Sequence, residues 1–303
     1  MNGLVQSADC RHIILIGETA IYNRIKSFLR SVENRYLVSF FKSDNAQKTI
    51  YCEQKKNTSQ SYWTSVYDEL IDLEEETLVI NCGCYYIYPP ALIGKKNLSL
   101  INFHNGLLPE YRGLNIPSWV IYNGEAQAGV TWHLICEKID AGEILKKGSI
   151  SIGQHEKAFQ LCKRLFDLAY NLFVDLWEEW RIGKLSLEEQ KDSKVKSYFY
   201  YGKAIPNDGI VDLGKDQPEV VYNTLRALDY GKLAIFPPVR LIDRDGNLCY
   251  LHRYWIGDDT FPAGGDKVFL EVNLNGSNLY LEVTREDGSS ERNHNEHSGR
   301  DKR

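Results

Sequence analysis

The chain has 303 residues, which is enough for one large domain or two smaller ones with buried cores. Hydrophobic residues make up 43% and charged residues 25% of the chain, a composition that is typical of a soluble globular protein and excludes wholesale disorder. The formal net charge of −5 argues against a nucleic-acid partner, because a protein that binds a phosphate backbone usually carries a basic face.

The seven cysteines are odd in number, and several lie inside apolar runs. No signal-peptide pattern opens the chain, so we expect free thiols in a reducing compartment and a cytoplasmic location. Cys82 and Cys84 form a C-x-C pair, but no second pair at zinc spacing accompanies them, and we expect no metal site. No apolar stretch approaches the roughly 20 residues that a membrane span needs, so no membrane partner is expected.

Short apolar runs alternate with helical patterns up to about residue 155. Runs this apolar are typical of strands covered on both faces, and the helices between them imply parallel pairing through right-handed crossovers. The sequence therefore predicts an α/β fold with a Rossmann-like open, mostly parallel sheet and a crevice beyond the carboxyl ends of its strands. The predicted strands are His12–Gly17, Tyr36–Phe41, Thr77–Cys82, Leu98–Phe103 and Val130–Cys136, and the predicted helices are Ala20–Leu29 and Ser61–Leu73.

The turn after the first predicted strand, residues 17–22, reads GETAIY. A dinucleotide-binding fold would show the glycine pattern G-x-G-x-x-G at this place. Because the pattern is missing, we expect a Rossmann-like sheet without bound NAD.

The chain after about residue 155 no longer shows alternating strand and helix patterns. A long helical pattern over Glu156–Ile182 is expected to pack across the first domain, and the polar run Lys184–Lys196 predicts a linker. A helix is predicted at Pro218–Leu228, and four apolar runs separated by Gly-containing turns predict a small β-rich second domain. These runs are Pro238–Ile242, Leu248–Trp255, Lys267–Val272 and Asn278–Val283. We expect a first domain over residues 1–184, a linker over 185–203, a β-rich domain over 204–284 and a polar, disordered tail over 285–303.

Three polar side chains are candidates for catalysis. Asn102 and His104 are two residues apart at the end of a predicted strand, so both leave the strand on one face. Asp140 lies in a polar turn between two strand candidates, and parallel neighbouring strands would bring it to the same end of the sheet. Each residue alone has an ordinary structural explanation: a strand-end cap, a core histidine and a turn former. Together they favour catalysis, because an amide can donate to an oxyanion, an imidazole can move protons, and a carboxylate can orient the imidazole.

At these residues the sequence resembles the folate-dependent formyltransferases, a family that includes methionyl-tRNA, glycinamide ribonucleotide and nucleotide-sugar N-formyltransferases. The matching segments are INFHNGLLPEYRG (101–113), GVTWH (129–133) and IDAGEIL (139–145). The resemblance implies the formyltransferase fold over residues 1–184, followed by a small OB-like domain. The chain departs from the family at Gly106, where many members carry Ser, and this puts one hydrogen bond to the folate in doubt.

The resemblance also implies a mechanism. An amine would attack the formyl carbon of the co-substrate N10-formyltetrahydrofolate, and Asn102 and protonated His104 would stabilise the oxyanion that forms. Asp140 would keep His104 charged and accept the proton that the amine loses. The folate would lie along the loop Cys84–Pro89 and the loop Gly106–Pro109. The expected folate-binding residues are Tyr86, Ile87, Tyr88, Gly106, Leu107, Leu108, Pro109 and Ile139.

The acceptor amine is less closely specified. Arg112 has two interpretations: it pairs with a phosphate or carboxylate of the acceptor, or it braces its own loop. Trp132 and His133 are neighbours on a strand, so only one of them faces the crevice. The residues expected to bind the acceptor are Arg112, Asn115, Trp119 and His133.

Several functions remain open at this point. The favoured acceptor is an aminodeoxysugar on a nucleotide, which suits the acidic chain and its aromatic-rich crevice. The alternatives are an aminoacyl group on a peptidyl-carrier protein, because the segment 113–119 and the TWH pattern resemble formylation domains of peptide synthetases, and initiator tRNA. A formyltetrahydrofolate hydrolase and a folate-binding module without turnover are further alternatives, and a homodimer is left open.

Overall fold

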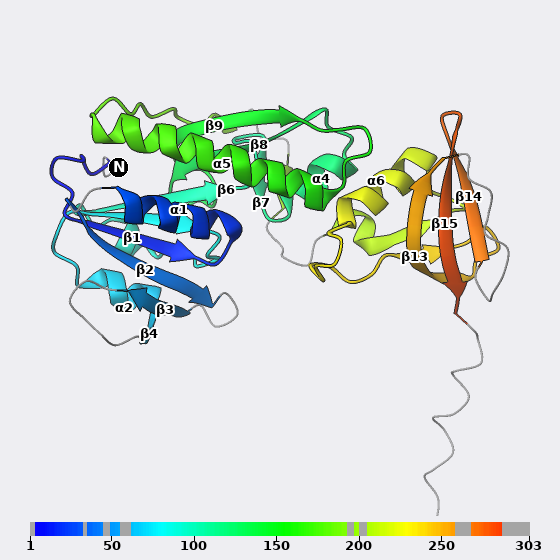
Figure 1. Ribbon diagram of the computed structural model, residues 1–303, viewed down its shortest axis with the longest axis horizontal. Helices are drawn as coiled ribbons and strands as arrows, with labels where there is room; N and C mark the ends of the chain where they lie inside the picture. The colour runs from blue at the N-terminus through cyan, green and yellow to red at the C-terminus, as the bar shows by residue number, and fades with distance from the viewer. Residues whose placement is uncertain are drawn as a thin grey trace, which may run out of the picture.

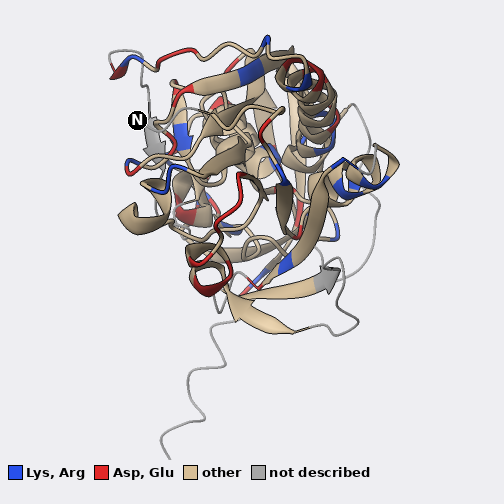
Figure 2. Cartoon of the chain, turned by 90° about the vertical axis from the view of Figure 1, so that its left-hand side faces the viewer, with Lys and Arg blue, Asp and Glu red and all other residues tan. Residues whose placement is uncertain are grey.

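The structure is a computed structural model, and it describes residues 4–32, 35–44, 49–54, 62–192, 197–199, 205–257 and 268–286. The chain forms an α/β part and a β-rich part that lie side by side (Figure 1). Basic and acidic residues are interspersed along the chain on the side shown in Figure 2, as expected for a modest net charge. None of the helices in these ranges is long and apolar enough to cross a membrane.

An eight-stranded sheet forms the centre of the α/β part, in the order β4-β3-β2-β1-β5-β6-β8-β9. The four strands β2, β1, β5 and β6 pair in parallel, and the strands at both flanks pair antiparallel. All six residues of β1 and all six of β5 are buried, because helices cover both faces of the sheet there. The strands are β1 (His12–Gly17), β2 (Leu37–Asp44), β3 (Thr49–Gln54), β4 (Trp63–Ser65), β5 (Thr77–Cys82), β6 (Leu98–His104), β8 (Gln127–Leu134) and β9 (Ile144–Ser151).

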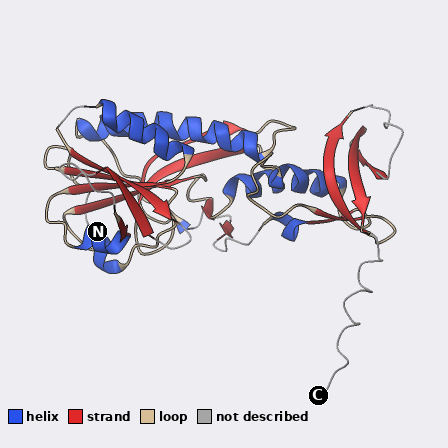
Figure 3. Ribbon diagram, turned by 60° about the horizontal axis from the view of Figure 1, so that its bottom comes forward, coloured by secondary structure: helices blue, strands red, loops and turns tan. Residues whose placement is uncertain are grey.

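Helices form one layer on each side of this sheet (Figure 3). The long helix α5 (Ala158–Arg181) lies across one face, where Leu161, Phe173 and Trp177 are buried against the sheet. Trp132 of β8 is fully buried on that face, and its indole N–H donates to the Ala169 carbonyl at 3.0 Å. The other helices are α1 (Ala20–Ser31), α2 (Val66–Ile71), α3 (Pro90–Ile93) and α4 (Ile116–Tyr122), and two short strands, β7 (Tyr111–Gly113) and β10 (Ser197–Phe199), pair in parallel beside the sheet.

The β-rich part has its own sheet and its own core. Its strand order is β11-β12-β13-β15-β14, and helix α6 (Pro218–Leu228) packs Val221 and Leu225 against it. The strands are β11 (Ile210–Asp212), β12 (Arg240–Ile242), β13 (Leu248–Ile256), β14 (Val268–Leu274) and β15 (Ser277–Arg285), and a 3-10 turn, η2 (Pro206–Gly209), precedes β11.

The predicted α/β class and the β-rich second part are confirmed. Of the predicted disordered tail, Arg285 belongs to β15, and residues 287–303 lie outside the described residues. The predicted linker, residues 185–203, holds β10 and several ordered contacts, while its residues 193–196 and 200–203 lie outside the described residues.

Two local predictions are wrong. The expected helix Ser61–Leu73 begins only at Val66, because Trp63–Ser65 form the edge strand β4 and Ser65 caps the helix by accepting from the Asp68 N–H at 3.0 Å. The expectation that parallel neighbours bring Asp140 to the site is also wrong, since β8 runs antiparallel to β6.

Candidate active site

Strand β6 carries two of the candidate residues on the same face. Asn102 is opposite His133 in the pairing of β6 with β8, and His104 is opposite Thr131. His104 is only 6% exposed, and the chain leaves the sheet directly after it. The alternation of side chains along the strand therefore gives Asn102 and His104 the shared face that the sequence predicts.

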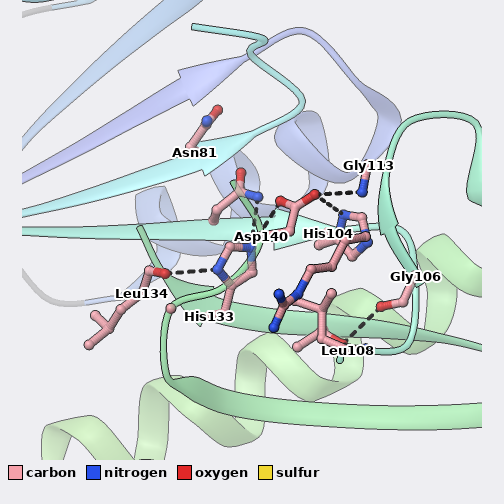
Figure 4. A network of polar contacts seen from close by, with 12 residues as sticks. Asn81, His104, Gly106, Leu108, Gly113, His133, Leu134 and Asp140 are labelled. Atoms are coloured by element: carbon pink, nitrogen blue, oxygen red, sulfur yellow. Dashed lines mark hydrogen bonds and ion pairs between the residues drawn. The ribbon is translucent and has the colours of Figure 1, made fainter. Parts of the chain in front are cut away.

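Asp140 reaches this face from the connection between β8 and β9. Its Oδ2 lies 3.6 Å from Nδ1 of His104, and its Oδ1 lies 3.6 Å from Nε2 of His133 (Figure 4). The Gly113 N–H donates to Oδ2 at 2.8 Å. The structure thus brings Asn102, His104 and Asp140 together, although by an antiparallel hairpin connection rather than by two parallel strands.

The backbone of Asp140 has φ = 52°, in the left-handed region. Residues other than glycine visit this region rarely, and Asp is among those that tolerate it best. The conformation aims the carboxylate, whose side chain is 11% exposed, at two histidine rings. A turn of this kind stays in place only where surrounding contacts hold it.

The ring of His104 lies between a carbonyl and a carboxylate. Its Nε2–H donates to the Tyr111 carbonyl at 2.8 Å, and its Nδ1 faces Asp140. When both nitrogens carry protons, one is bonded to Tyr111 and the other points at the carboxylate. Both ring nitrogens of His104 therefore have polar partners within the protein.

His133 is a second buried histidine, and its hydrogen bonds define its tautomer. Nδ1 lies 2.8 Å from the Leu134 carbonyl, which can only accept, so Nδ1 carries the hydrogen. Nε2 is then an acceptor, and it receives a hydrogen bond from the Asn102 Nδ2 at 3.1 Å. Burial lowers the pKa of His133 to about 4, against the opposing effect of Asp140, so the ring is neutral near neutral pH.

This neutral ring orients the amide of Asn102. An amide nitrogen has two hydrogens, so one hydrogen can bond to His133 while the other is directed elsewhere. Of the predicted neighbours on β8, His133 is the one that faces the site, whereas Trp132 lies in the core on the opposite face. The predicted acceptor-binding residue His133 thus contacts Asn102 and Asp140 directly.

The two predicted folate loops are each held by a polar side chain from the sheet. Asn81 accepts from the Cys84 N–H and donates to the Cys84 carbonyl, both at 3.0 Å, and so fixes the start of the loop Cys84–Pro89. Thr131 accepts from the Leu108 N–H at 3.1 Å and donates to the Gly106 carbonyl at 2.8 Å. Neither Asn81 nor Thr131 is among the residues predicted from the sequence.

The predicted folate residues differ in exposure. Ile87 and Ile139 are exposed, whereas Leu108 and Tyr88 are buried, so Tyr88 can offer a ligand little beyond its backbone. A cavity of about 500 Å³ lies beside the Asp140 turn, between the start of α3, the start of β6 and the end of β8. Its lining begins at Pro90, directly after the loop Cys84–Pro89, and contains none of the eight predicted residues. The lining residues are Pro90, Ile93, Gly94, Leu98, Ser99, Leu100, Leu134, Ile135, Cys136, Glu137, Lys138, Gly142 and Glu143.

Three of the residues predicted to bind the acceptor have structural roles or contacts within the protein itself. Arg112 is fully buried, and its guanidinium donates to Asp192 at 2.9 Å and to Gln190 at 2.8 Å, which corresponds to the loop-bracing interpretation. Asn115 adopts φ = 59° directly before α4, and Trp119 packs edge to face on Tyr122.

The C-x-C pair consists of two free thiols. Cys82 and Cys84 are both buried, and burial raises the pKa of both thiols. Within the described ranges, no group of three or more His, Cys, Asp or Glu side chains has an arrangement that could hold a metal ion.

The mixed sheet, the polar cluster at its centre and the β-rich second part define a protein of the formyltransferase fold. Residues 39–176 match the model of the family described as formyl transferase. Over this segment, which is less than half of the chain, the sequence is similar to the formyl transferase family.

Methionyl-tRNA formyltransferase of Thermotoga sp. (strain RQ2) is 37% identical to the chain over 143 residues. The match covers 46% of this chain and 44% of that protein, so it spans less than half of the relative's length.

Solved structures share the fold at low sequence identity. An N-formyltransferase from Helicobacter canadensis, in complex with folinic acid and dTDP-3-aminofucose, has a TM-score of 0.60 at 18% identity, covering 89% of this chain and 98% of its own. HypX from Aquifex aeolicus, in complex with tetrahydrofolic acid, has a TM-score of 0.62 at 16% identity, covering 90% of this chain and 43% of its own.

The lowered pKa of His133 predicts a pH dependence of stability. Between about 4 and the ordinary value of 6.5, the unfolded chain binds more protons at this residue than the native chain. The stability contributed by the neutral ring is therefore complete above pH 6.5 and is lost as the pH falls toward 4. We expect the wild type to lose about 3 kcal/mol more unfolding free energy than His133→Gln between pH 7 and pH 4. Urea unfolding of both proteins across this range measures the difference, and parallel curves would contradict the prediction.

Proposed function

We propose that the protein transfers a formyl group from N10-formyltetrahydrofolate to a primary amine, and that this amine belongs to an aminodeoxysugar carried on a nucleotide. The observation that carries the proposal is the cluster of Asn102, His104 and Asp140, which lies within the segment that matches the family. The Helicobacter canadensis structure, which contains folinic acid and dTDP-3-aminofucose, supports the choice of donor and acceptor class.

The surroundings of the cluster suit a folate. The cavity of about 500 Å³ beside the Asp140 turn falls within the usual range for small-molecule sites. Its lining combines apolar residues such as Leu100 and Ile135 with the charged residues Glu137, Lys138 and Glu143, and a mainly apolar site with a few polar groups suits a flat ring with polar edges. The backbone of residues 86–88 and the loop 106–109 would hold the rest of the donor, and Ile139 would cover it. The bound donor supplies an activated formyl group.

Asn102, His104 and Asp140 would each have a separate role in the reaction at the formyl carbon. When the amine nitrogen attacks, the formyl oxygen becomes an oxyanion, and the second Nδ2–H of Asn102 would donate to it. Because both nitrogens of His104 already have protein partners, His104 would act through its charge and as a proton carrier. Asp140 would take the proton that the amine loses, and a proton would return to N10 as the bond between N10 and the formyl carbon breaks. Loss of one oxyanion donor usually costs about 2.7–4 kcal/mol in the barrier.

We also propose a cytoplasmic location. All seven cysteines are free thiols, which supports a reducing compartment.

Other acceptors remain alternatives to the aminosugar. The Thermotoga relative is named as a methionyl-tRNA formyltransferase, so initiator tRNA stays an alternative, together with a carrier-bound aminoacyl group and simple hydrolysis. The net charge of −5 favours a small acceptor over tRNA.

A panel of acceptors tests the reaction. The protein is incubated with N10-formyltetrahydrofolate and, separately, with dTDP-3-aminofucose, other nucleotide-linked aminosugars, a carrier-bound amino acid and methionyl-tRNA. We expect mass spectrometry to show a gain of one formyl group on an aminosugar. Formylation of the carrier or the tRNA alone would overturn the acceptor class, and release of formate without any formylated product would favour the hydrolase.

Substitutions in the cluster test the assignment of roles. We expect Asn102→Ala to lower kcat about 100- to 1,000-fold, as for loss of an oxyanion donor. Asp140→Asn keeps the size of the side chain but removes its charge and its capacity to take a proton, and we expect formyl transfer to be abolished. The matched control is Asp245→Asn, on an exposed side chain of the β-rich part. Wild-type kcat in either cluster variant, with the control also active, would refute the assignment.

Gly106 leaves room for the ring of His104. A Cβ at this position would lie 2.6 Å from His104 Nε2 and 3.0 Å from the Tyr111 carbonyl oxygen, which are the two atoms that form the hydrogen bond. Many family members carry Ser here, so a side chain at this position requires a different placement of the histidine ring.

We therefore expect Gly106→Ala to lower kcat about 10- to 100-fold, because a displacement of about 1 Å at a catalytic group has an effect of this size. Gly153→Ala is the control, since a Cβ there meets Glu156 at an ordinary 3.4 Å. Steady-state kinetics of both variants measure the effect. Unchanged kcat in Gly106→Ala would show that His104 tolerates the displacement.

A further inference from the structure

The chain that follows α5 returns to the catalytic face before it enters the second part. Glu188 pairs with Ile144 at the start of β9 through two backbone hydrogen bonds of 2.8 and 2.9 Å. This pairing fixes residues 188–192 beside the Asp140 turn. A segment that looks like a simple polar linker in the sequence is therefore in direct contact with the candidate active site.

Both the nitrogen and the oxygen of the Gln190 side-chain amide form hydrogen bonds at this site. Its Nε2 donates to the Asp140 carbonyl at 3.1 Å and to the Gly142 carbonyl at 2.7 Å. Its Oε1 accepts from Nη2 of Arg112 at 2.8 Å. One side chain thus connects the turn that bears Asp140 to strand β7.

Arg112 adds an ion pair to this connection. Its guanidinium is fully buried, and Nη1 donates to Asp192 Oδ1 at 2.9 Å, while Lys138 of the Asp140 loop donates to Asp192 Oδ2 at 2.7 Å. The hydrogen bonds from Lys138 and Arg112 lower the pKa of Asp192. A buried guanidinium needs such partners, because an uncompensated buried charge is strongly destabilising.

These contacts hold the Asp140 turn at two points. The Gly113 N–H, one residue after Arg112, bonds to the Asp140 carboxylate, and Gln190 bonds to the Asp140 carbonyl. With both points held, the left-handed backbone of Asp140 and the direction of its carboxylate are defined together.

We propose that Gln190 and Asp192, in the segment that joins the two parts of the chain, are positioning residues that hold the Asp140 turn against His104. The proposal rests on the catalytic role of Asp140 in the proposed function. Its consequence is that the catalytic sheet depends on the joining segment for an active geometry. Neither residue contacts a substrate; they act through Asp140 and Arg112.

The test compares three variants of the full chain. Gln190→Met keeps the length of the side chain and removes all three hydrogen bonds, whereas Gln190→Glu retains the contact with Arg112 but cannot donate to the Asp140 and Gly142 carbonyls. Glu189→Met, at an exposed neighbour in the same segment, is the matched control. With N10-formyltetrahydrofolate and the best acceptor of the panel, we expect both Gln190 variants to lower kcat about 10- to 100-fold and to change the acceptor KM less than about twofold.

Hydrogen exchange gives a readout that needs no activity. In Gln190→Met, peptides covering residues 111–115 and 138–143 should exchange faster, while peptides of β1 and β5 keep the wild-type rate. Faster exchange with reduced kcat, together with an unaffected Glu189→Met, supports the proposal.

Three results would overturn the proposal: wild-type kcat in Gln190→Met, wild-type exchange in it, or full activity in Gln190→Glu, which would make the Arg112 contact sufficient. If the wild type transfers no formyl group at all, the proposed function fails, and hydrogen exchange still decides whether Gln190 holds the turn.

Discussion

The site depends on one buried carboxylate. A carboxylate that is 11% exposed, as the side chain of Asp140 is, loses most of its hydration. The Gly113 N–H and the ring of His104 replace part of that hydration, whereas the unprotonated Nε2 of His133 has no hydrogen to donate to the carboxylate. Neither of these two partners lies near Asp140 in the sequence, so the fold has to bring them to it: β6 provides the histidine and β7 the backbone donor.

The two histidines around this carboxylate have different tasks because their surroundings differ. His133 is neutral, since burial lowers its pKa to about 4 and its Nδ1–H is bonded to a carbonyl, and it acts as an acceptor for Asn102. His104 has a carbonyl on one side and the carboxylate on the other, so its two ring nitrogens face Tyr111 and Asp140 instead of an amide.

The sequence was sufficient to predict those elements whose structure is determined by local residue patterns. The bounds of β1 and β5 match the predicted bounds residue for residue, because a short continuous apolar run between turn residues is typical of a strand covered on both faces. The pair Asn102 and His104 could be placed on one face by strand alternation alone.

Long-range pairing could not be found in this way. The direction of β8 relative to β6 depends on a pairing that no local pattern encodes, and β9 has a polar, exposed alternation that is weak as a strand signal. The hydrogen bonds of Gln190 join it to residues 48, 50 and 78 positions away, and the only sequence signal for this residue was a polar run. Thr131 and Asn81 were missed because a Thr or Asn within a strand is unremarkable until its backbone partners are known.

The buried state of Arg112 also constrains how an acceptor is recognised. A phosphate of a nucleotide sugar could pair with this guanidinium only by displacing Asp192 and Gln190, the residues that connect to the Asp140 turn. Recognition by Arg112 would therefore loosen the carboxylate that the proposed reaction needs. If the acceptor is a nucleotide-linked aminosugar, as we propose, its negative charge would have to be met by other cations or by backbone N–H groups, and the reaction centre would be separate from the part of the surface that selects the amine.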